Sequence, residues 1–351
     1  MRIGIPKEIK TYEARVALIP AACAELVQHG HDVFIQEQAG IHAGYSDELY
    51  QQVGCQLTAT AEQTYASSEL IVKVKEPLPE EVKMLRPDQL LFSYLHLAAE
   101  PALLASLQES GGTAIGFETV QVGRQLPLLA PMSDIAGRLS VQIGATLLQH
   151  HHGGRGVLLG GLAGTERGHV VILGAGVAGG HAALIAQGLG ANVTIFDPNR
   201  DKLTQMRALG PNVTGLHANA HDIEQHVQQA DLLVGAVLIP GTRAPKLVSK
   251  ALVAKMLPGS VIVDISVDQG GCIETTRPTT YAEPTFLVND VVHFGVTNMP
   301  GAVPRSASQA LSAALLPYIL RLATPDWKAD EALRSGVNVE AGEIVHPALM
   351  V

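Results

Sequence analysis

The side chains best placed for chemistry are five polar residues that lie at or beyond the ends of short apolar runs: Arg15, Lys75, His96, Asp268 and Asn298. Such runs are typical of buried parallel strands, and in an open parallel sheet ligands bind outside the carboxyl ends of the strands. Each residue alone also has an ordinary role, as a solvated lysine, a core histidine, a turn aspartate or a surface arginine. Their shared position favours a binding site.

These groups match what the oxidation of an α-amino acid requires. Arg15 can clamp a carboxylate through two parallel N–H bonds, and Lys75 can bind the keto oxygen or the carboxylate. An imidazole such as that of His96 both accepts and donates protons at cellular pH. Asp268 can hold the amine or the hydrolytic water. We therefore expect His96 and Asp268 to be catalytic, and Arg15 and Lys75 to bind the substrate.

A dinucleotide-binding loop is the strongest local motif, in the segment Val170-Val-Ile-Leu-Gly-Ala-Gly-Val-Ala-Gly179. Gly174 permits the tight turn, Gly176 lets the backbone approach the pyrophosphate, and Gly179 lets a helix pack close to the strand. The next predicted strand ends at Asp197, about 20 residues further on, where a carboxylate accepts both ribose hydroxyls and repels a 2′-phosphate. The motif predicts NAD as the cofactor.

Two cations beyond that strand bear on the choice between NAD and NADP. Arg200 and Lys202 follow Asp197 closely, and a nearby cation can accommodate the 2′-phosphate of NADP. The acid stands at the strand end itself, so NAD remains the expectation.

The elements that must position these residues form two sets of short apolar strands separated by helical patterns. The first set is predicted at residues 2–5, 32–36, 70–75, 90–96 and 113–117, and the second at 170–173, 192–196, 232–237, 261–265 and 294–297. Helices are expected at 21–29, 133–149, 181–188 and 307–323. Strands that alternate with helices indicate parallel sheets. The predicted fold class is α/β, with two doubly wound, Rossmann-like domains, mostly parallel sheets and a cleft between them.

Domain boundaries follow from this pattern. A chain of 351 residues, 47% hydrophobic, is long enough for two cores. We expect a discontinuous substrate domain at 1–128 plus 308–351, because the tail should return to the first domain. The NAD-binding domain is expected at 129–307.

Composition excludes several classes of protein. The net charge of −9 and scattered lysines and arginines argue against nucleic-acid binding. Three widely spaced cysteines and a charged N-terminus favour a cytoplasmic protein. The most membrane-like stretch, 307–323, is too short and polar to span a bilayer, so no membrane association is expected. His150-His-His152 lacks partners at ligand spacing, and we expect no metal.

In motifs spread from residue 1 to about residue 323, the chain resembles the alanine dehydrogenase family, which includes nicotinamide nucleotide transhydrogenase alpha subunits. The motifs are Gly4-Ile-Pro-Lys-Glu8, Arg15-Val-Ala17 with Pro20, Val74-Lys-Glu-Pro77, Tyr94-Leu-His96, Ala130-Pro-Met-Ser133, Gly153-Gly-Arg-Gly156, the glycine loop, Val237-Leu-Ile-Pro-Gly241, Ala244-Pro-Lys246, Asp268-Gln-Gly-Gly271, Arg277-Pro-Thr-Thr280 and Asn298-Met-Pro300. Tyr12-Glu13 departs from the usual Asn-Glu of the opening signature.

The resemblance implies reversible, NAD-dependent conversion of L-alanine to pyruvate and ammonia. It implies that Arg15 and Lys75 bind the substrate and that His96 and Asp268 are catalytic. It implies an NAD site lined by Ser133, Ala178, Asp197, Lys202, Leu238, Asn298 and Met299. A serine that often contacts the adenosine ribose is replaced by Asn219 or Ala220, so that contact is left open. The family is typically a homo-oligomer, often a hexamer.

Three alternatives are consistent with the same architecture. The first is the nucleotide-binding subunit of a proton-translocating transhydrogenase, against which Lys75, His96 and Asp268 argue, as does the expected lack of trailing membrane segments. The second is a non-catalytic NAD-sensing protein, which would not need the polar set. The third is a dehydrogenase for a bulkier amino acid.

Overall fold

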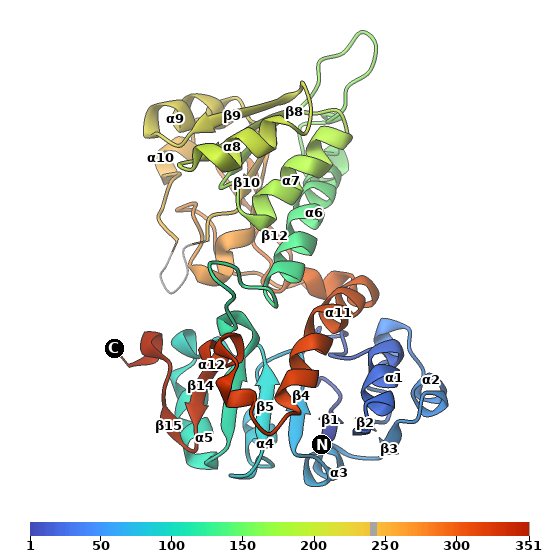
Figure 1. Cartoon of the computed structure of the whole chain (residues 1–351). Coiled ribbons are helices and arrows are strands. Elements are labelled where there is room, and N and C mark those ends of the chain that lie inside the picture. Colours follow the sequence, from blue (N-terminus) through green and yellow to red (C-terminus); the bar gives the residue numbers. More distant parts are fainter. Residues whose placement is uncertain (239–243, 351) are drawn as a thin grey trace. The chain divides into compact units, whose positions relative to one another are not determined.

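The computed structural model describes residues 1–238 and 244–350, which form two compact units. Unit 1 comprises Met1–Met132 and Gly301–Val351, and unit 2 comprises Ser133–Pro300. The last segment of the chain therefore belongs to the same unit as the first, and the red C-terminal helices lie beside the blue and cyan strands in Figure 1.

Unit 1 is built on an eight-stranded sheet in the order β15-β14-β6-β5-β4-β1-β2-β3. The pairs among β1 to β6 are parallel, whereas β14 pairs antiparallel with both β6 and β15. The strands are β1 (Arg2–Ile5), β2 (Asp32–Gln36), β3 (Gln56–Thr58), β4 (Leu70–Val72), β5 (Leu90–Ser93), β6 (Thr113–Gly116), β14 (Val337–Glu340) and β15 (Glu343–Ile344).

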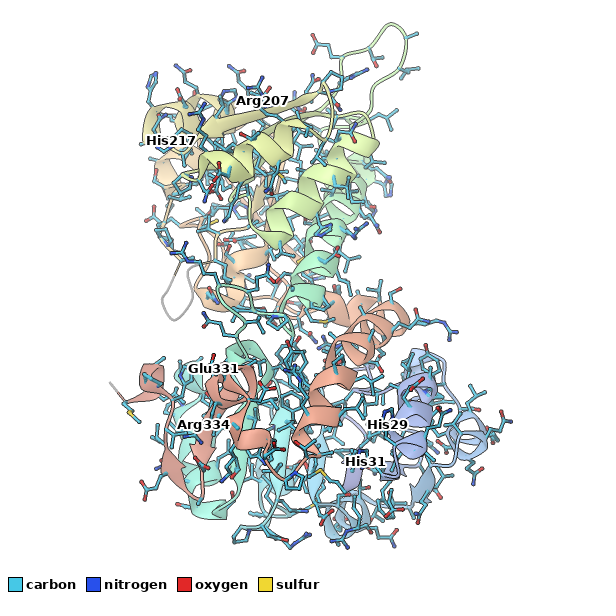
Figure 2. The ribbon with its side chains drawn as sticks, viewed as in Figure 1. His29, His31, Arg207, His217, Glu331 and Arg334 are labelled. Atoms are coloured by element: carbon cyan, nitrogen blue, oxygen red, sulfur yellow. The ribbon has the colours of Figure 1, made fainter. Side chains whose placement is uncertain are left out.

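The helices of unit 1 begin and end at recognisable signals. Proline occupies the first turn of α1, α4, α5 and α11, where its missing N–H costs no helical hydrogen bond, and α5 ends at Gly111 in the left-handed region (φ 69°). Arg334 of α12, labelled in Figure 2, donates to Glu340 of β14 at 2.9 Å. The helices are α1 (Pro20–Gln28), α2 (Asp47–Gln52), α3 (Ala61–Ser67), α4 (Pro79–Val82), α5 (Pro101–Ser110), α11 (Pro304–Leu322) and α12 (Glu331–Gly336).

Unit 2 is built on a seven-stranded sheet in the order β12-β13-β11-β10-β7-β8-β9, in which only the β12–β13 pair is antiparallel. The strands are β7 (His169–Leu173), β8 (Asn192–Asp197), β9 (Val213–His217), β10 (Leu232–Gly235), β11 (Val261–Asp264), β12 (Thr285–Val288) and β13 (Val291–Phe294). The helices are α6 (Ala130–Leu147), which starts in unit 1, α7 (Val177–Gly188), α8 (Arg200–Arg207), α9 (Ala220–Gln228) and α10 (Lys250–Val253).

The central strands of both sheets are buried on both faces. Every residue of β4 and of β10 is buried, as expected for strands covered by helices on each side. One core cluster of unit 2 packs β7, β10 and β11 against α9 and α10, and one of unit 1 packs β4 and β5 against α4 and α5. The predicted fold class, two mostly parallel doubly wound sheets, is confirmed.

The predicted strand at 294–297 is wrong. The strand β13 spans Val291–Phe294 and pairs with β12 across a turn at Asn289 and Asp290, whose φ angles are 50° and 60°. Two consecutive left-handed residues of this type are the signature of a tight hairpin turn. Asn298 therefore follows a further loop instead of ending a strand.

Other predicted strands are too long. β4 ends at Val72, β5 at Ser93 and β10 at Gly235, so Lys75 and His96 lie in the loops that follow β4 and β5. The predicted helix at 181–188 begins earlier, at Val177, directly after the glycine loop. Among the described residues, no helix is long and apolar enough to cross a membrane.

Candidate functional site

The glycine loop after β7 has the backbone geometry that its motif requires. Gly174 has a φ of 97°, and a Cβ there would lie 2.6 Å from the carbonyl oxygen of Ala236. A Cβ on Gly179 would lie 1.8 Å from the carbonyl oxygen of Gly174. At Gly176, by contrast, a Cβ would meet no atom of the described residues within 4 Å. Gly174 and Gly179 are thus needed for packing, while the described residues leave space beside Gly176 at the start of α7.

Asp197, at the end of β8, is tied to this loop. Its carboxylate accepts hydrogen bonds from the backbone N–H groups of Ala175 and Asn199, each at 2.8 Å. The ammonium of Lys202 lies 3.7 Å from the same carboxylate. The Asp197 side chain is 9% exposed and that of Lys202 is 46% exposed. The structure therefore brings Gly174, Ala175, Asp197 and Lys202 together at one corner of the sheet.

Helix α6 approaches the start of α7 closely. A Cβ on Gly137 would lie 2.1 Å from the carbonyl oxygen of Ala178, so the two helices touch through backbone at this point. Ser133 lies one turn earlier on α6 and is half-buried. Gly137 was not singled out in the sequence, although a glycine inside a helical pattern is a known signal of close packing.

Asp268 lies on the 3₁₀ turn Ile265–Gln269, just beyond β11, and its side chain is exposed. The turn is held by Asp264, the last residue of β11. Its carboxylate accepts from the N–H groups of Ser266 (3.0 Å) and Cys272 (3.1 Å). Burial raises the pKa of Asp264, although hydrogen bonds to its carboxylate act in the opposite direction.

The remaining predicted cofactor residues of unit 2 lie on loops. Asn298 has a φ of 61°, and the buried Met299 that follows accepts a hydrogen bond at its carbonyl from the hydroxyl of Tyr281 (3.0 Å). Leu238 is 47% exposed, just beyond β10. The motif at 237–241 extends past residue 238, and its last three residues lie outside the described residues. Asn219 caps α9, accepting from the N–H of Asp222 at 2.9 Å.

In unit 1, Arg15 forms a buried pair with Glu13. The guanidinium donates through Nε and Nη2 to the two carboxylate oxygens at 2.6 and 2.5 Å, while Nη1 lies 3.1 Å from the sulfur of Met132. The side chains are 2% and 1% exposed. Burial acts to lower the pKa of Arg15, but the Glu13 carboxylate outweighs it, so this pKa lies above its ordinary value. Glu13 thus fixes the orientation of the guanidinium.

His96 is held by its backbone and projects outward. It has a left-handed conformation (φ 50°), and its N–H donates to Glu118 at 2.6 Å. Its exposed ring stacks on the buried ring of Tyr94, with centroids 6.0 Å apart. The Tyr94 hydroxyl donates to the carbonyl of Leu128 at 2.6 Å, and burial raises the pKa of this phenol although the charge of Arg15 lowers it.

Lys75 lies beyond β4 with a side chain 14% exposed, and its ammonium is 3.3 Å from Glu76. Lys10 also donates to Glu76. Burial acts to raise the pKa of Glu76, but Lys75 and Lys10 outweigh it and lower this pKa to about 2. The neighbouring Lys73 is instead enclosed, 1% exposed, between two carboxylates.

The structure therefore gathers the candidates into two groups, one in each unit. Arg15, Lys75 and His96 follow the carboxyl ends of β1, β4 and β5, three adjacent strands of unit 1. The glycine loop, Asp197, Leu238 and Asp268 lie at or just beyond the carboxyl ends of β7, β8, β10 and β11 in unit 2.

Sequence reasoning missed the side chains that orient the candidates: Glu13, Glu76, Tyr94, Glu118 and Asp264. Adjacency in sequence was a usable signal for Glu13, Glu76 and Tyr94.

His150, His151 and His152 form an exposed 3₁₀ turn. In the part of the chain that the structure describes, no cluster of three or more histidine, cysteine or acidic side chains could hold a metal ion.

Known proteins resemble the whole chain. Family models described as "Alanine dehydrogenase/PNT, N-terminal domain" and "Alanine dehydrogenase/PNT, C-terminal domain" match residues 4–136 and 140–347. The alanine dehydrogenase of Mycobacterium tuberculosis is 49% identical, covering 98% of this chain and 95% of that protein. A solved L-alanine dehydrogenase has a TM-score of 0.95 at 54% identity, covering 99% of this chain and 98% of its own.

A solved transhydrogenase from Sinorhizobium meliloti shares the architecture at lower identity. Its TM-score is 0.85 at 25% identity, with 99% of this chain and 100% of that chain covered. The sequence is thus more similar to the two alanine dehydrogenases above than to this transhydrogenase.

Proposed function

The chain belongs to the alanine dehydrogenase/PNT family, and on that premise we propose that it is an NAD-dependent alanine dehydrogenase, which interconverts L-alanine with pyruvate and ammonia. The observation that carries the proposal is the group of substrate-type side chains at one edge of unit 1. There an oriented guanidinium, an ammonium and an imidazole follow three adjacent parallel strands.

The residues present fit NAD. The described residues leave space beside Gly176, where a pyrophosphate would lie close to the backbone N–H groups that begin α7 and stabilise an anion. Asp197 is positioned by two backbone N–H groups and can accept the adenosine ribose hydroxyls. Ser133, Gly174, Ala178, Gly179, Lys202, Leu238, Asn298 and Met299 complete the proposed site. NAD held by these residues would supply the hydride acceptor for the oxidation of alanine at Cα.

This chain's own residues bind the substrate and move its protons. Arg15, held by Glu13, binds the alanine carboxylate, and Lys75 binds the oxygen that becomes the keto group. His96 accepts a proton from the water that supplies this oxygen and returns it to the departing nitrogen. Asp268 assists by holding the amine or the water. In the reverse direction His96 accepts a proton from the attacking nitrogen and returns it to the oxygen that leaves as water.

An assay of NADH formation with a panel of amino acids tests the proposal. Activity should be greatest with L-alanine and should require ammonia and pyruvate together in the reverse direction. A preference for a larger amino acid would show that the chain is a dehydrogenase for a bulkier substrate. Cofactor binding without turnover of any amino acid would leave an NAD sensor, or a transhydrogenase-type subunit such as the Sinorhizobium relative suggests.

The proposal extends to the assembly and the compartment. We expect a homo-oligomer, specifically a hexamer, so light scattering should give six times the 37.0 kDa chain mass. A monomer would contradict it. We place the enzyme in the cytoplasm, because its three cysteines are free and buried, which suits a reducing compartment. Cell fractionation with an activity assay checks this.

A further inference from the structure

The loop that carries Asp268 is held from two sides, by Asp264 and by Lys246. On the inner side, the 1% exposed Asp264 accepts from the N–H groups of Ser266 and Cys272, at 3.0 and 3.1 Å, and from the hydroxyl of Thr276 at 2.7 Å. A carboxylate accepting several bonds of this kind fixes the backbone on either side of the turn.

On the outer side, the exposed Lys246 binds the same loop through its carbonyl groups. Its Nζ donates to the carbonyl of Gly270 at 2.5 Å and to that of Ile273 at 3.2 Å. The backbone alongside pairs as well, since the N–H of Ala244 donates to the carbonyl of Gln269 at 3.2 Å and that of Leu247 to the carbonyl of Cys272 at 2.8 Å. Lys246 therefore joins the segment after β10 to the loop after β11.

The loop needs such support because of its composition. Gly270 and Gly271 follow Asp268 closely and have φ angles of 88° and 74°. Glycine has a wide choice of conformations, so the sequence alone does not fix the direction of this segment. Carbonyl groups at the end of a helical turn carry partial negative charge, which the ammonium of Lys246 complements.

We propose that Lys246 is a positioning residue for the reaction. It binds the carbonyls of Gly270 and Ile273 while Asp264 binds the same loop from the inner side, and together these bonds fix the position of the Asp268 carboxylate. Lys246 does not touch the reacting atoms in this scheme. The inference rests on the catalytic role proposed for Asp268, and its test separates the two.

The test compares Lys246→Met, Lys246→Arg and a matched control in the full-length enzyme. The control is Lys255→Met, since Lys255 is another exposed lysine of unit 2, and its ammonium donates to the Glu224 carboxylate at 2.7 Å. Hydrogen exchange of the backbone N–H groups at 266–273 reports the hold on the loop. Steady-state kinetics report kcat and the KM for NAD and alanine.

Lys246→Met should speed exchange at 266–273 and lower kcat on the order of ten- to a hundredfold, because a small displacement of a catalytic group has effects of this size. The KM for NAD should change little. Lys246→Arg keeps a cationic donor and should recover part of kcat, while Lys255→Met should match the parent in both measurements.

Unchanged exchange, or faster exchange with unchanged kcat, would overturn the inference. Asp268→Asn separates it from the proposed function. If that variant has the parental kcat, Asp268 is not catalytic. A lowered kcat in Lys246→Met would then have another cause, and Lys246 would not be a positioning residue for Asp268. If Asp268→Asn is slow and Lys246→Met is normal, the catalytic assignment stands and the positioning role alone fails.

Discussion

The carboxylate of Glu118 accepts a 2.6 Å hydrogen bond from the backbone N–H of His96, a residue in the left-handed conformation. Glu118 also accepts from the N–H of Leu95 at 3.1 Å. A left-handed residue with a side chain costs about 1–2 kcal/mol relative to the right-handed region, so it needs such support. The bond holds the backbone of His96 in this conformation, and the imidazole is exposed.

Glu118→Ala should therefore lower kcat, on the order of tenfold or more, because the loop around His96 loses its anchor. The affinity for NAD should stay the same, since the predicted cofactor residues belong to the other unit. Kinetics together with NAD titration check this. Glu118→Gln retains an acceptor oxygen, and its kcat should lie between those of the parent and of Glu118→Ala. Parental kcat in the alanine variant would contradict the role given to this carboxylate.

His96→Ala should remove most turnover, on the order of a hundredfold or more, while leaving NAD binding intact, because positioned proton transfer contributes that much. His29→Ala is the control, since His29 is an exposed histidine of the same unit, labelled in Figure 2. Comparable kcat values for the two variants would refute the assignment of His96.

Asp197→Ser should relax the preference for NAD over NADP. The serine no longer repels a 2′-phosphate, and the ammonium of Lys202, now 3.7 Å from the carboxylate, is released to bind it. The ratio of kcat/KM for the two cofactors measures the effect. Asp201→Ser, on the exposed first turn of α8, should leave the ratio unchanged. An unaltered ratio in both variants would count against Asp197 as the ribose ligand.

Glu13→Ala should lower the free energy of unfolding by about 3–5 kcal/mol, because it leaves the buried Arg15 guanidinium uncompensated. Urea denaturation gives the change. Glu69→Ala removes the carboxylate of an exposed pair with Arg2 and should cost about 0–1 kcal/mol. Equal losses in the two variants would show that the buried pair has no special weight.

Glu76 predicts a pH dependence of stability. Its pKa is lowered from 4.5 to about 2 in the folded protein, so its stabilising contribution is complete above pH 4.5 and is lost as the pH falls towards about 2. Glu76→Gln should therefore lower the melting temperature most near neutral pH, and the gap from the parent should close on acidification. A gap that is constant between neutral pH and pH 3 would show that the carboxylate titrates normally.

The sequence patterns located most strands because buried parallel strands are apolar along their whole length. The hairpin β12–β13 was not predicted, because its buried strand contains His293, which interrupts the apolar pattern. The sequence signal for this hairpin was the turn pair Asn289 and Asp290. The position of Asn298 was misjudged as a result.

The candidate ligands were found more easily than the residues that orient them. The run at 70–75 contains two lysines on the same side of an extended chain, and nothing in the pattern separates the enclosed Lys73 from the more accessible Lys75. The hydrogen bond between Glu118 and His96 joins the segments that follow two neighbouring strands, β6 and β5, so it depends on tertiary packing and not on sequence spacing.

The contact of Gly137 with Ala178 means that α6, which carries Ser133 of the proposed NAD site, also bears on the position of α7, the helix that begins beside that site. One added methyl group at Gly137 would press on the carbonyl of Ala178 and push the first turn of α7 aside. The N–H groups of that turn are the ones expected to meet the pyrophosphate. If the proposed NAD site is correct, the missing side chain at Gly137, about forty residues earlier in the chain, is what lets the backbone donors for the coenzyme's phosphates keep their place.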